Sequence, residues 1–414
     1  MSEYILARAN GRTIPKEDKI FGISNRAKAA IAEKGKENVV NGTIGALLDD
    51  EGELVVLQSV DEVFRQLGPR EYAEYAPIGG IQAFREAVQK AAFGEHVPEG
   101  YTEAVATPGG TGSLRNVISN YSDVGDAVLT SDWHWAPYKT IAGEIGRSVA
   151  TFRLFTEDRK FNIEDFRARS SELLAKQSSL VIILNTPAHN PTGYSLTLED
   201  WDAVIDVIRE EAKCGKAIAL LVDAAYIDFA GDDEEKCRRF IPKLSGLPEN
   251  VLSIIAYSLS KTFTLYGARC GAMICIAKTQ KIAEEFKRVC EFSSRGSWSN
   301  SAKIAQVILS RIYSDPQLLE KVNAERKIYR DMLAARGKAF SDAAAECGLQ
   351  IVPYDAGFFV SVPCSDPDAV SQRLEKEDVF LVPLAKGIRV SVASIPESVC
   401  AALPPIIKKA LDEQ

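Results

Sequence analysis

The residue best suited to covalent chemistry in this sequence is a lysine set among hydroxyl side chains, directly after a predicted buried strand. Lys261 lies in segment 258–271, which reads SLSKTFTLYGARCG. A lysine at a strand end can form a Schiff base with an aldehyde cofactor when its ammonium is partly desolvated. Ser258 and Arg269 would offer a hydroxyl and a bidentate cation to a phosphate. The alternative is a surface lysine in a polar loop, and it would also have to explain these neighbours.

An acidic residue and an aromatic residue add to this chemistry. Asp223 ends the apolar run 217–223, and the segment around it, 220–226, reads LLVDAAY. A carboxylate at the buried end of a strand is costly unless it meets a cation or a donor, and a protonated pyridine nitrogen would be such a partner. A helix cap or an internal salt bridge is the structural alternative. Trp135, in SDWHWAPY, could be a core aromatic or could cover a planar ring.

Two segments are rich in glycine or proline: one precedes a predicted helix, and the other follows a predicted strand. Segment 109–113, GGTGS, precedes a helical pattern that begins at Leu114, and segment 186–193, TPAHNPTG, follows an apolar run. Glycines allow a close approach of the backbone, and a helix start attracts an anion, although a plain turn has the same composition. Segment 109–113 matches neither GxGxxG nor a P-loop, so neither a dinucleotide-binding fold nor a nucleoside-triphosphate site is supported.

These residues must be positioned by alternating strands and helices. Short apolar runs predict strands at 127–131, 180–185, 217–223, 251–257 and 271–277, and amphipathic stretches such as 198–213 and 278–292 lie between them. The alternation predicts an α/β fold whose mostly parallel sheet is covered by helices.

A long helical stretch at 316–347 breaks the alternation. After it, the pattern predicts extended chain at 351–362, a helix at 367–376 and strands at 379–383 and 388–393. This α+β pattern indicates a second, smaller domain.

Composition excludes several classes of function. The net charge is −8 and the isoelectric point is near 5.3, which argues against nucleic acid or an anionic membrane as a partner. Eight cysteines without a CxxC pair, together with three histidines, give no reason to expect a metal site. No signal peptide is evident, and no apolar run approaches the roughly 20 residues of a spanning helix. We expect a cytoplasmic protein.

Taken together and in order, the motifs resemble those of a known family. The series GGTGS, Trp135, AHNPTG, DxxY, SxSK and an arginine eight positions after the lysine resembles fold-type I pyridoxal-phosphate enzymes. Within them it looks most like the aspartate and aromatic aminotransferase branch of class I. The similarity extends almost end to end, because segments 40–45 (VNGTIG), 74–80 (EYAPIGG) and 388–393 (IRVSVA) also match that branch.

The resemblance implies roles for the ring of pyridoxal 5'-phosphate. Lys261 would hold the cofactor covalently and then act as general base. Asp223 would pair with the pyridinium nitrogen, Asn190 and Tyr226 would hydrogen-bond the phenolic oxygen, and Trp135 would stack on the ring.

It also implies groups for the phosphate and for the substrate. Those for the phosphate are Gly110, Thr111, Ser258 and Arg269, with Tyr75 reaching the phosphate of the neighbouring subunit in a homodimer. Arg389 would clamp the α-carboxylate of the substrate, with Gly45, Trp135 and Asn190 around it. Arg295 would read a distal carboxylate across the dimer. The alternatives are an Arg389 that satisfies strand-end carbonyls and an Arg295 that is a solvated charge.

The implied domains are an N-terminal segment 1–48 that joins the small domain, a large cofactor-binding domain at 49–315 and a small domain at 316–414.

The implied activity is ping-pong exchange of an amino group between an L-amino acid (aspartate, glutamate or aromatic) and a 2-oxo acid such as 2-oxoglutarate. A C–S lyase or decarboxylase of the same fold, or a ligand-sensing non-enzyme, is the alternative. Some positions depart from the branch, notably Tyr138 in place of a histidine that supports the buried aspartate.

Overall fold

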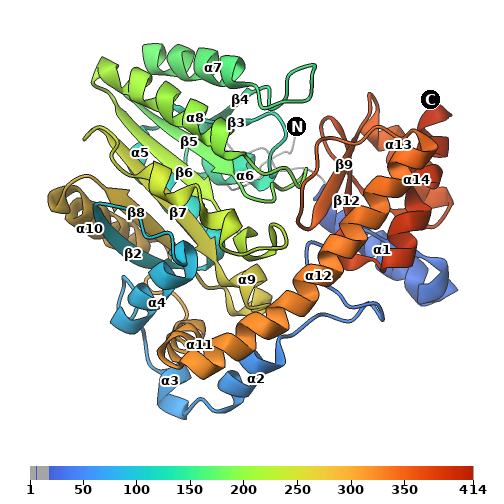
Figure 1. Cartoon of the computed structure of the whole chain (residues 1–414), viewed down its shortest axis with the longest axis horizontal. Helices are drawn as coiled ribbons and strands as arrows, with labels where there is room; N and C mark the ends of the chain where they lie inside the picture. Colours follow the sequence, from blue (N-terminus) through green and yellow to red (C-terminus); the bar gives the residue numbers. More distant parts are fainter. Residues whose placement is uncertain (1–5, 7–17, 414) are drawn as a thin grey trace.

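A seven-stranded sheet forms the centre of the larger part of the chain in the computed structural model, which describes residue 6 and residues 18–413 (Figure 1). In order across the sheet, the strands are β2 (Tyr101–Thr107), β8 (Gly271–Ala277), β7 (Val251–Ser258), β6 (Ala217–Asp223), β5 (Ser179–Asn185), β3 (Ala127–Ser131) and β4 (Ser148–Phe152). Only β8 runs against its neighbours. The predicted mostly parallel α/β sheet is therefore confirmed. Its two edge strands, β2 and β4, were not predicted, because both are partly exposed and lack a continuous apolar run.

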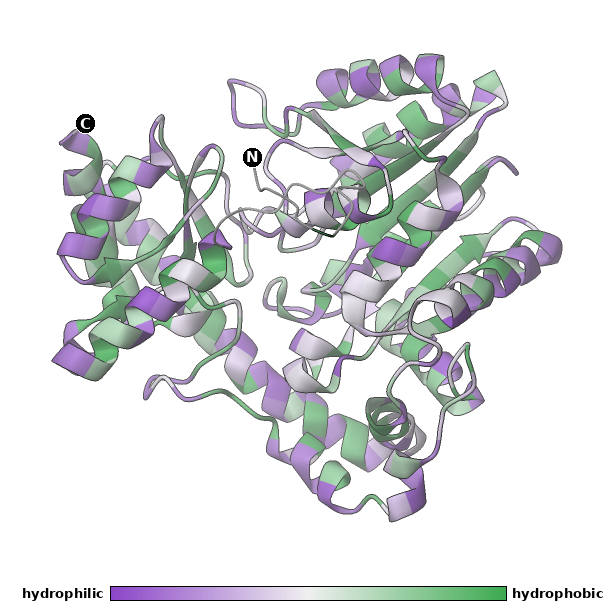
Figure 2. Ribbon diagram, turned by 180° about the vertical axis from the view of Figure 1, so that it is seen from behind, coloured by the Kyte–Doolittle hydropathy of each residue, from purple (hydrophilic) through white to green (hydrophobic). Residues whose placement is uncertain are grey.

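Side chains that alternate along the strands fill two cores, one on each face of the sheet. In β5, Leu180, Ile182 and Leu184 pack into one core, whereas Val181 and Ile183 pack into the other. The first face is covered by α4 (Gln82–Phe93), α7 (Ile163–Lys176), α8 (Leu198–Glu211) and α11 (Lys303–Ser314). The second is covered by α5 (Gly109–Tyr121), α6 (Pro137–Glu144) and α10 (Gln280–Ser297). The strands are accordingly hydrophobic and the outer helix faces more polar (Figure 2).

The smaller body combines the two ends of the described chain. Its sheet has the order β11 (Val382–Pro383), β12 (Gly387–Ser391), β9 (Phe359–Pro363), and it packs with α13 (Pro367–Lys376) and α14 (Glu397–Asp412). Strand β1 (Val40–Asn41) pairs with β10 (Val379–Phe380), and α1 (Lys19–Lys34) covers this pair. Of the predicted extended segment 351–362, only its end is a strand. The predicted N-terminal segment 1–48 lies partly outside the described residues.

The long helix α12 (Pro316–Cys347) links the two bodies (Figure 1). It has the bounds expected from the sequence, and the side chain of Asp315 caps its first turn. Val322 packs into the large core, whereas Leu333 and Phe340 pack into the small one. The boundary between the two hydrophobic cores therefore lies within α12. The division of the chain into domains at residue 316 stays a prediction. None of the helices in the described part of the chain is both long and apolar enough to cross a bilayer.

Candidate active site

A cavity of about 500 Å³ opens at the carboxyl ends of the parallel strands, where α/β sheets commonly bind ligands. Both bodies contribute to its lining. Of the residues predicted for the site, all but Tyr75 and Arg295 line it, namely Gly45, Gly110, Thr111, Trp135, Asn190, Asp223, Tyr226, Ser258, Lys261, Arg269 and Arg389. Lys261 and Asp223, on which the predicted chemistry depends, therefore share one cavity.

Lys261 lies on α9 (Leu259–Thr262), a single turn that follows β7 directly. Its Nζ donates a hydrogen bond to the Gly45 carbonyl at 2.7 Å and lies 4.6 Å from the centre of the Tyr266 ring. Burial, with smaller contributions from the charges of Arg269 and Arg389, lowers the pKa of Lys261 to about 7. Much of this amine is therefore uncharged at neutral pH, which is the state that attacks a carbonyl.

Asp223, the last residue of β6, is buried without a cationic partner. The Tyr138 hydroxyl donates to its Oδ2 at 2.6 Å. Burial raises the pKa of Asp223 to about 6, although the bonds from Tyr138 and from the backbone N–H of Ala225 oppose the rise. None of the described residues forms an ion pair with it. A cationic N–H that enters the cavity would supply the missing partner, and the pyridinium nitrogen of pyridoxal phosphate is such a group.

Arg389 is the opposite case, a buried cation that forms no ion pair within the part of the chain that the structure describes. Its Nη2 donates to the Thr43 carbonyl at 3.0 Å, its Nη1 lies 3.5 Å from Asn190 Oδ1, and its guanidinium lies over the Phe359 ring at 4.3 Å. Its Nε has no hydrogen-bond partner among the described residues. Burial lowers the pKa of Arg389 to about 10, so the group stays charged. A carboxylate would satisfy it in a bidentate manner.

Asn190 connects these groups to Tyr226. Its Nδ2 donates to Tyr226 Oη at 3.3 Å, and its backbone N–H donates to Asn185 Oδ1 at 2.6 Å. Asn185 in turn donates to the Asp223 carbonyl at 2.7 Å. The ends of β5 and β6 are thereby tied together under the cavity, which holds Asn190, Tyr226 and Asp223 in one fixed arrangement.

An anion cradle lies at the N-terminus of α5. This helix begins at Gly109, so the expectation that it begins at Leu114 is wrong, and the glycine-rich segment is itself its first turn. A Cβ on Gly109 would lie 3.0 Å from Arg269 Nη2, and one on Gly110 would lie 3.7 Å from Ser258 Cβ. Free helix N–H groups, a hydroxyl and a guanidinium therefore converge, as a phosphate requires.

The sequence analysis missed several residues of the cavity. Ser260, whose Oγ lies 3.4 Å from Arg269 Nη1, belongs to the same SxSK motif as Ser258 and was not assigned. Helix α1 contributes one face to the lining, which consists of Ile20, Phe21, Ser24 and Lys28. Helical spacing predicts that these four share a face, but nothing in that spacing indicates which cavity the face covers.

Tyr75 and Arg295 lie outside this cavity. Tyr75 is 89% exposed, and Arg295 is exposed and donates to Ser299 Oγ at 2.6 Å. Asn300 donates to the Ala76 carbonyl at 2.8 Å, which brings the loop with Tyr75 close to the end of α10 that carries Arg295. Their roles across a dimer stay predictions.

Solved aminotransferase structures share this fold. An aminotransferase from Anaerococcus prevotii superposes with a TM-score of 0.95 at 38% identity, over 98% of this chain and all of that one. An aromatic-amino-acid aminotransferase from Burkholderia pseudomallei, solved covalently bound to pyridoxal phosphate, superposes with a TM-score of 0.80 at 21% identity, over 98% of this chain and all of that one. The fold is thus that of the fold-type I aminotransferases.

Sequence comparison agrees with this class. The model of the family "Aminotransferase class I and II" matches residues 37–403. The aspartate aminotransferase of Pseudomonas aeruginosa is 28% identical over 83% of this chain and 85% of its own length. The chain therefore belongs to the aminotransferase class I and II family. It is an enzyme, a transaminase, as the resemblance of its motifs implied.

Proposed function

We propose that this transaminase uses pyridoxal 5'-phosphate held by Lys261. On this proposal it exchanges an amino group between an L-amino acid (aspartate, glutamate or aromatic) and a 2-oxo acid such as 2-oxoglutarate, in a ping-pong cycle. The observation that carries the proposal is the pair of unmatched charges, Asp223 and Arg389, in the cavity of a lysine whose pKa is near 7. A pyridinium nitrogen would complement Asp223, and the carboxylate of an amino acid would complement Arg389.

When bound, the cofactor supplies an electron sink, which accepts the electron pair that remains on Cα when the Cα–H bond of the substrate breaks. Asp223 keeps the ring nitrogen protonated, because a buried carboxylate prefers a cation beside it. Arg389 orients the α-carboxylate, and Lys261, once its amine is free, removes the Cα proton as general base. The cradle formed by α5, Ser258, Ser260 and Arg269 anchors the phosphate.

A homodimer with shared sites is part of the proposal. Large apolar side chains are exposed on the side of the large body that carries Tyr75 and α10, where Phe292 is 83% exposed and Val289 is 37% exposed. Such exposure on a soluble enzyme is typical of an interface. A second copy that covers it could bring its own Tyr75 and Arg295 to the cavity.

A cytoplasmic location also belongs to the proposal. All eight cysteines are free thiols. Unpaired cysteines are typical of a reducing compartment.

The test is a half-reaction screen of amino acids against the cofactor-loaded enzyme, followed by absorbance. An aminotransferase leaves aminated cofactor and an oxo acid, whereas a C–S lyase releases ammonia and pyruvate.

Lys261→Ala should abolish the transfer, and full turnover by that variant would overturn the proposal. Arg295→Ala should slow aspartate selectively; equal losses for aspartate and phenylalanine would contradict a role for Arg295 in reading the distal carboxylate.

A further inference from the structure

A buried ionic cluster lies behind the lysine turn, and its centre is Asp228. Asp228 is 1% exposed and follows β6 in the chain. Its Oδ2 accepts from Thr262 Oγ1 at 2.6 Å and from Tyr257 Oη at 3.0 Å, and its Oδ1 accepts from Arg238 Nη2 at 2.5 Å. None of these residues lines the cavity of Lys261.

Two of these partners bracket the segment that carries the reactive lysine. Tyr257 precedes Ser258, and Thr262 follows Lys261. Helix α9 has only four residues, and a single helical turn is not stable without tertiary contacts. Its cap, the bond from the Ser260 N–H to Ser258 Oγ, is long at 3.3 Å. The contacts of Tyr257 and Thr262 with Asp228 therefore add to the bond from the Leu259 N–H to the Cys270 carbonyl, at 3.1 Å, in holding this turn in place.

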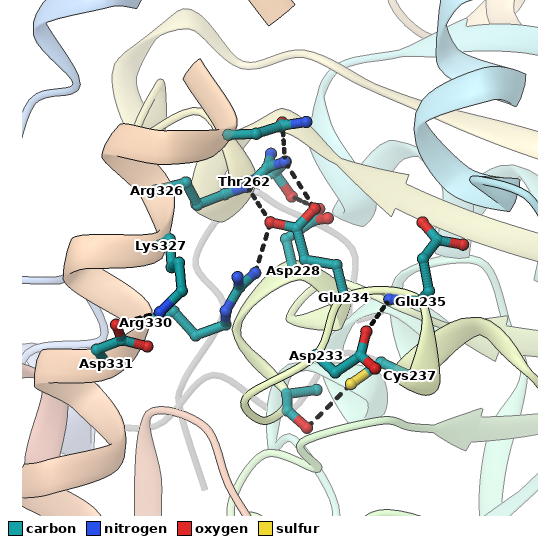
Figure 3. A network of polar contacts seen from close by, with 12 residues as sticks. Asp228, Asp233, Glu234, Glu235, Cys237, Thr262, Arg326, Lys327, Arg330 and Asp331 are labelled. Carbon is teal, nitrogen blue, oxygen red and sulfur yellow. Dashed lines mark hydrogen bonds and ion pairs between the residues drawn. The ribbon is translucent and has the colours of Figure 1, made fainter. Parts of the chain in front are cut away.

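The cluster extends to the helix that links the two bodies. From α12, Arg326 donates to both oxygens of Glu234 at 3.3 and 3.2 Å, and Arg330 donates to Glu234 at 2.5 Å (Figure 3). The Arg238 guanidinium donates to the backbone carbonyl of Glu234 at 2.8 Å, so it joins the Asp228 carboxylate to the backbone of Glu234. Arg238 thereby connects the α12 contacts of Glu234 with the contact between Asp228 and Thr262 in the turn with Lys261, and Figure 3 shows the contacts on both sides of this link.

Electrostatics hold the cluster together. Burial by itself raises the pKa of Asp228. The charges of Arg238 and Arg326 and the hydrogen bonds from Thr262 and Arg238 outweigh that effect and leave the pKa below its ordinary value. Asp228 is consequently ionised at every pH at which the enzyme would work, and its bonds to Thr262 and Tyr257 are the stronger, charge-assisted kind.

We propose that Asp228 is a positioning residue for Lys261: through Thr262 and Tyr257 it holds the one-turn helix α9 so that the lysine amine stays inside the cavity, beside the Gly45 carbonyl. The inference rests on the proposed function, because the position of this amine affects turnover only if the amine reacts. The two are nevertheless separable, since the exposure of Lys261 can be measured without cofactor or substrate.

The experiment uses Thr262→Val, which keeps the shape of the side chain and removes only its donor to Asp228. Direct replacement of Asp228 would leave Arg238 buried and unpaired and could unfold the chain. The reactivity of Lys261 toward trace acetic anhydride is followed against pH in the cofactor-free chain by peptide mass spectrometry. The titratable groups that share the cavity with the amine are Lys28, Asp223, Tyr226, Tyr266, Arg269 and Arg389, and the variants leave all of them in place.

Two variants serve as controls. Thr262→Ser keeps a hydroxyl in reach of Asp228. Thr130→Val removes a different buried hydroxyl, which donates to the Ile183 carbonyl at 2.9 Å in the central sheet.

We expect Thr262→Val to raise the labelling pKa of Lys261 by about one unit, because a looser turn lets water reach the amine. Turnover should fall about tenfold with little change in KM, and Thr262→Ser should restore both values. A Thr262→Val profile identical to that of the parent chain would overturn the proposal, and so would an equal shift in Thr130→Val. Full turnover by Lys261→Ala would instead remove the proposed function and leave the labelling result valid.

Discussion

Two buried aspartates in the same stretch of chain, Asp223 at the end of β6 and Asp228 just beyond it, have opposite electrostatic surroundings. Asp223 is 5% exposed and Asp228 is 1% exposed. Burial raises the pKa of Asp223 to about 6, since its partners are the neutral hydroxyl of Tyr138 and a backbone N–H. The pKa of Asp228 lies below its ordinary value, because the guanidinium charges of Arg238 and Arg326 outweigh its burial.

The difference separates a structural carboxylate from one suited to a ligand. The chain supplies a cation for Asp228, and the resulting ion pair is internal to the fold. Residues 18–413 supply none for Asp223, which instead faces a cavity of about 500 Å³. A buried charge left without a partner is destabilising unless a ligand completes it, so unmatched charges indicate binding sites.

The largest effect in this comparison should come from Asp228→Asn. The change breaks a buried ion pair and should lower the free energy of unfolding by about 3–5 kcal/mol. Chemical denaturation of the cofactor-free chain measures it. Asp61→Asn is the control, because in the Asp61–Arg65 pair the arginine is exposed and the aspartate only partly buried, so the pair should contribute less than about 1 kcal/mol. Similar losses in the two variants would show that Asp228 is not a special case.

Asp223→Asn should act on catalysis instead. The ring nitrogen would lose the charge that keeps it protonated, and turnover should fall about 10³-fold, which corresponds to about 4 kcal/mol of transition-state stabilisation. Single-turnover transfer of the amino group to bound cofactor is the measurement. Turnover within a few-fold of the parent enzyme would show that Asp223 serves structure alone.

The pH dependence of stability gives a smaller but distinct signature. The folded-state pKa of Asp223 is about 6, above its ordinary value of 3.8. Its carboxyl therefore stabilises the cofactor-free fold when protonated, a contribution that is complete below about pH 4 and is lost as the pH rises through about 6. Relative to Asp223→Asn, the free energy of unfolding of the parent chain should fall by on the order of 3 kcal/mol between about pH 4 and pH 7, as measured by chemical denaturation. If the difference in unfolding free energy between the two proteins does not vary with pH, the raised pKa of Asp223 is contradicted.

The smallest effect should come from Tyr138→Phe. It removes the 2.6 Å bond to Asp223 Oδ2 and disfavours the ionised carboxylate. Affinity for pyridoxal phosphate, measured by absorbance titration, should fall about tenfold. The control is Tyr194→Phe, which removes a 2.7 Å bond to Asp200 outside the cavity and should leave affinity unchanged. Equal affinities in all three proteins would show that Tyr138 does not support Asp223.

Much of the fold could be predicted because strands that are buried on both faces of a sheet are continuous apolar runs. The bounds of β3, β6 and β8 were predicted from such runs alone, and so were those of α12 and α13 from helical periodicity. The edge strands β2 and β4 were missed because half-exposed strands carry mixed side chains. The start of α5 was missed because glycines in a first helical turn have the composition of a loop.

The sequence by itself determined which side chains stand at strand ends, and the order of its motifs indicated the family. It contained no sign that Asp228 has a cation and Asp223 has none. Arg238 and Arg326 reach Asp228 and its neighbour Glu234 from later elements, and the carbonyl that holds Lys261 belongs to Gly45, far earlier in the chain. Whether a buried charge is matched depends on distances in space, and only the tertiary structure brings these groups within reach of one another.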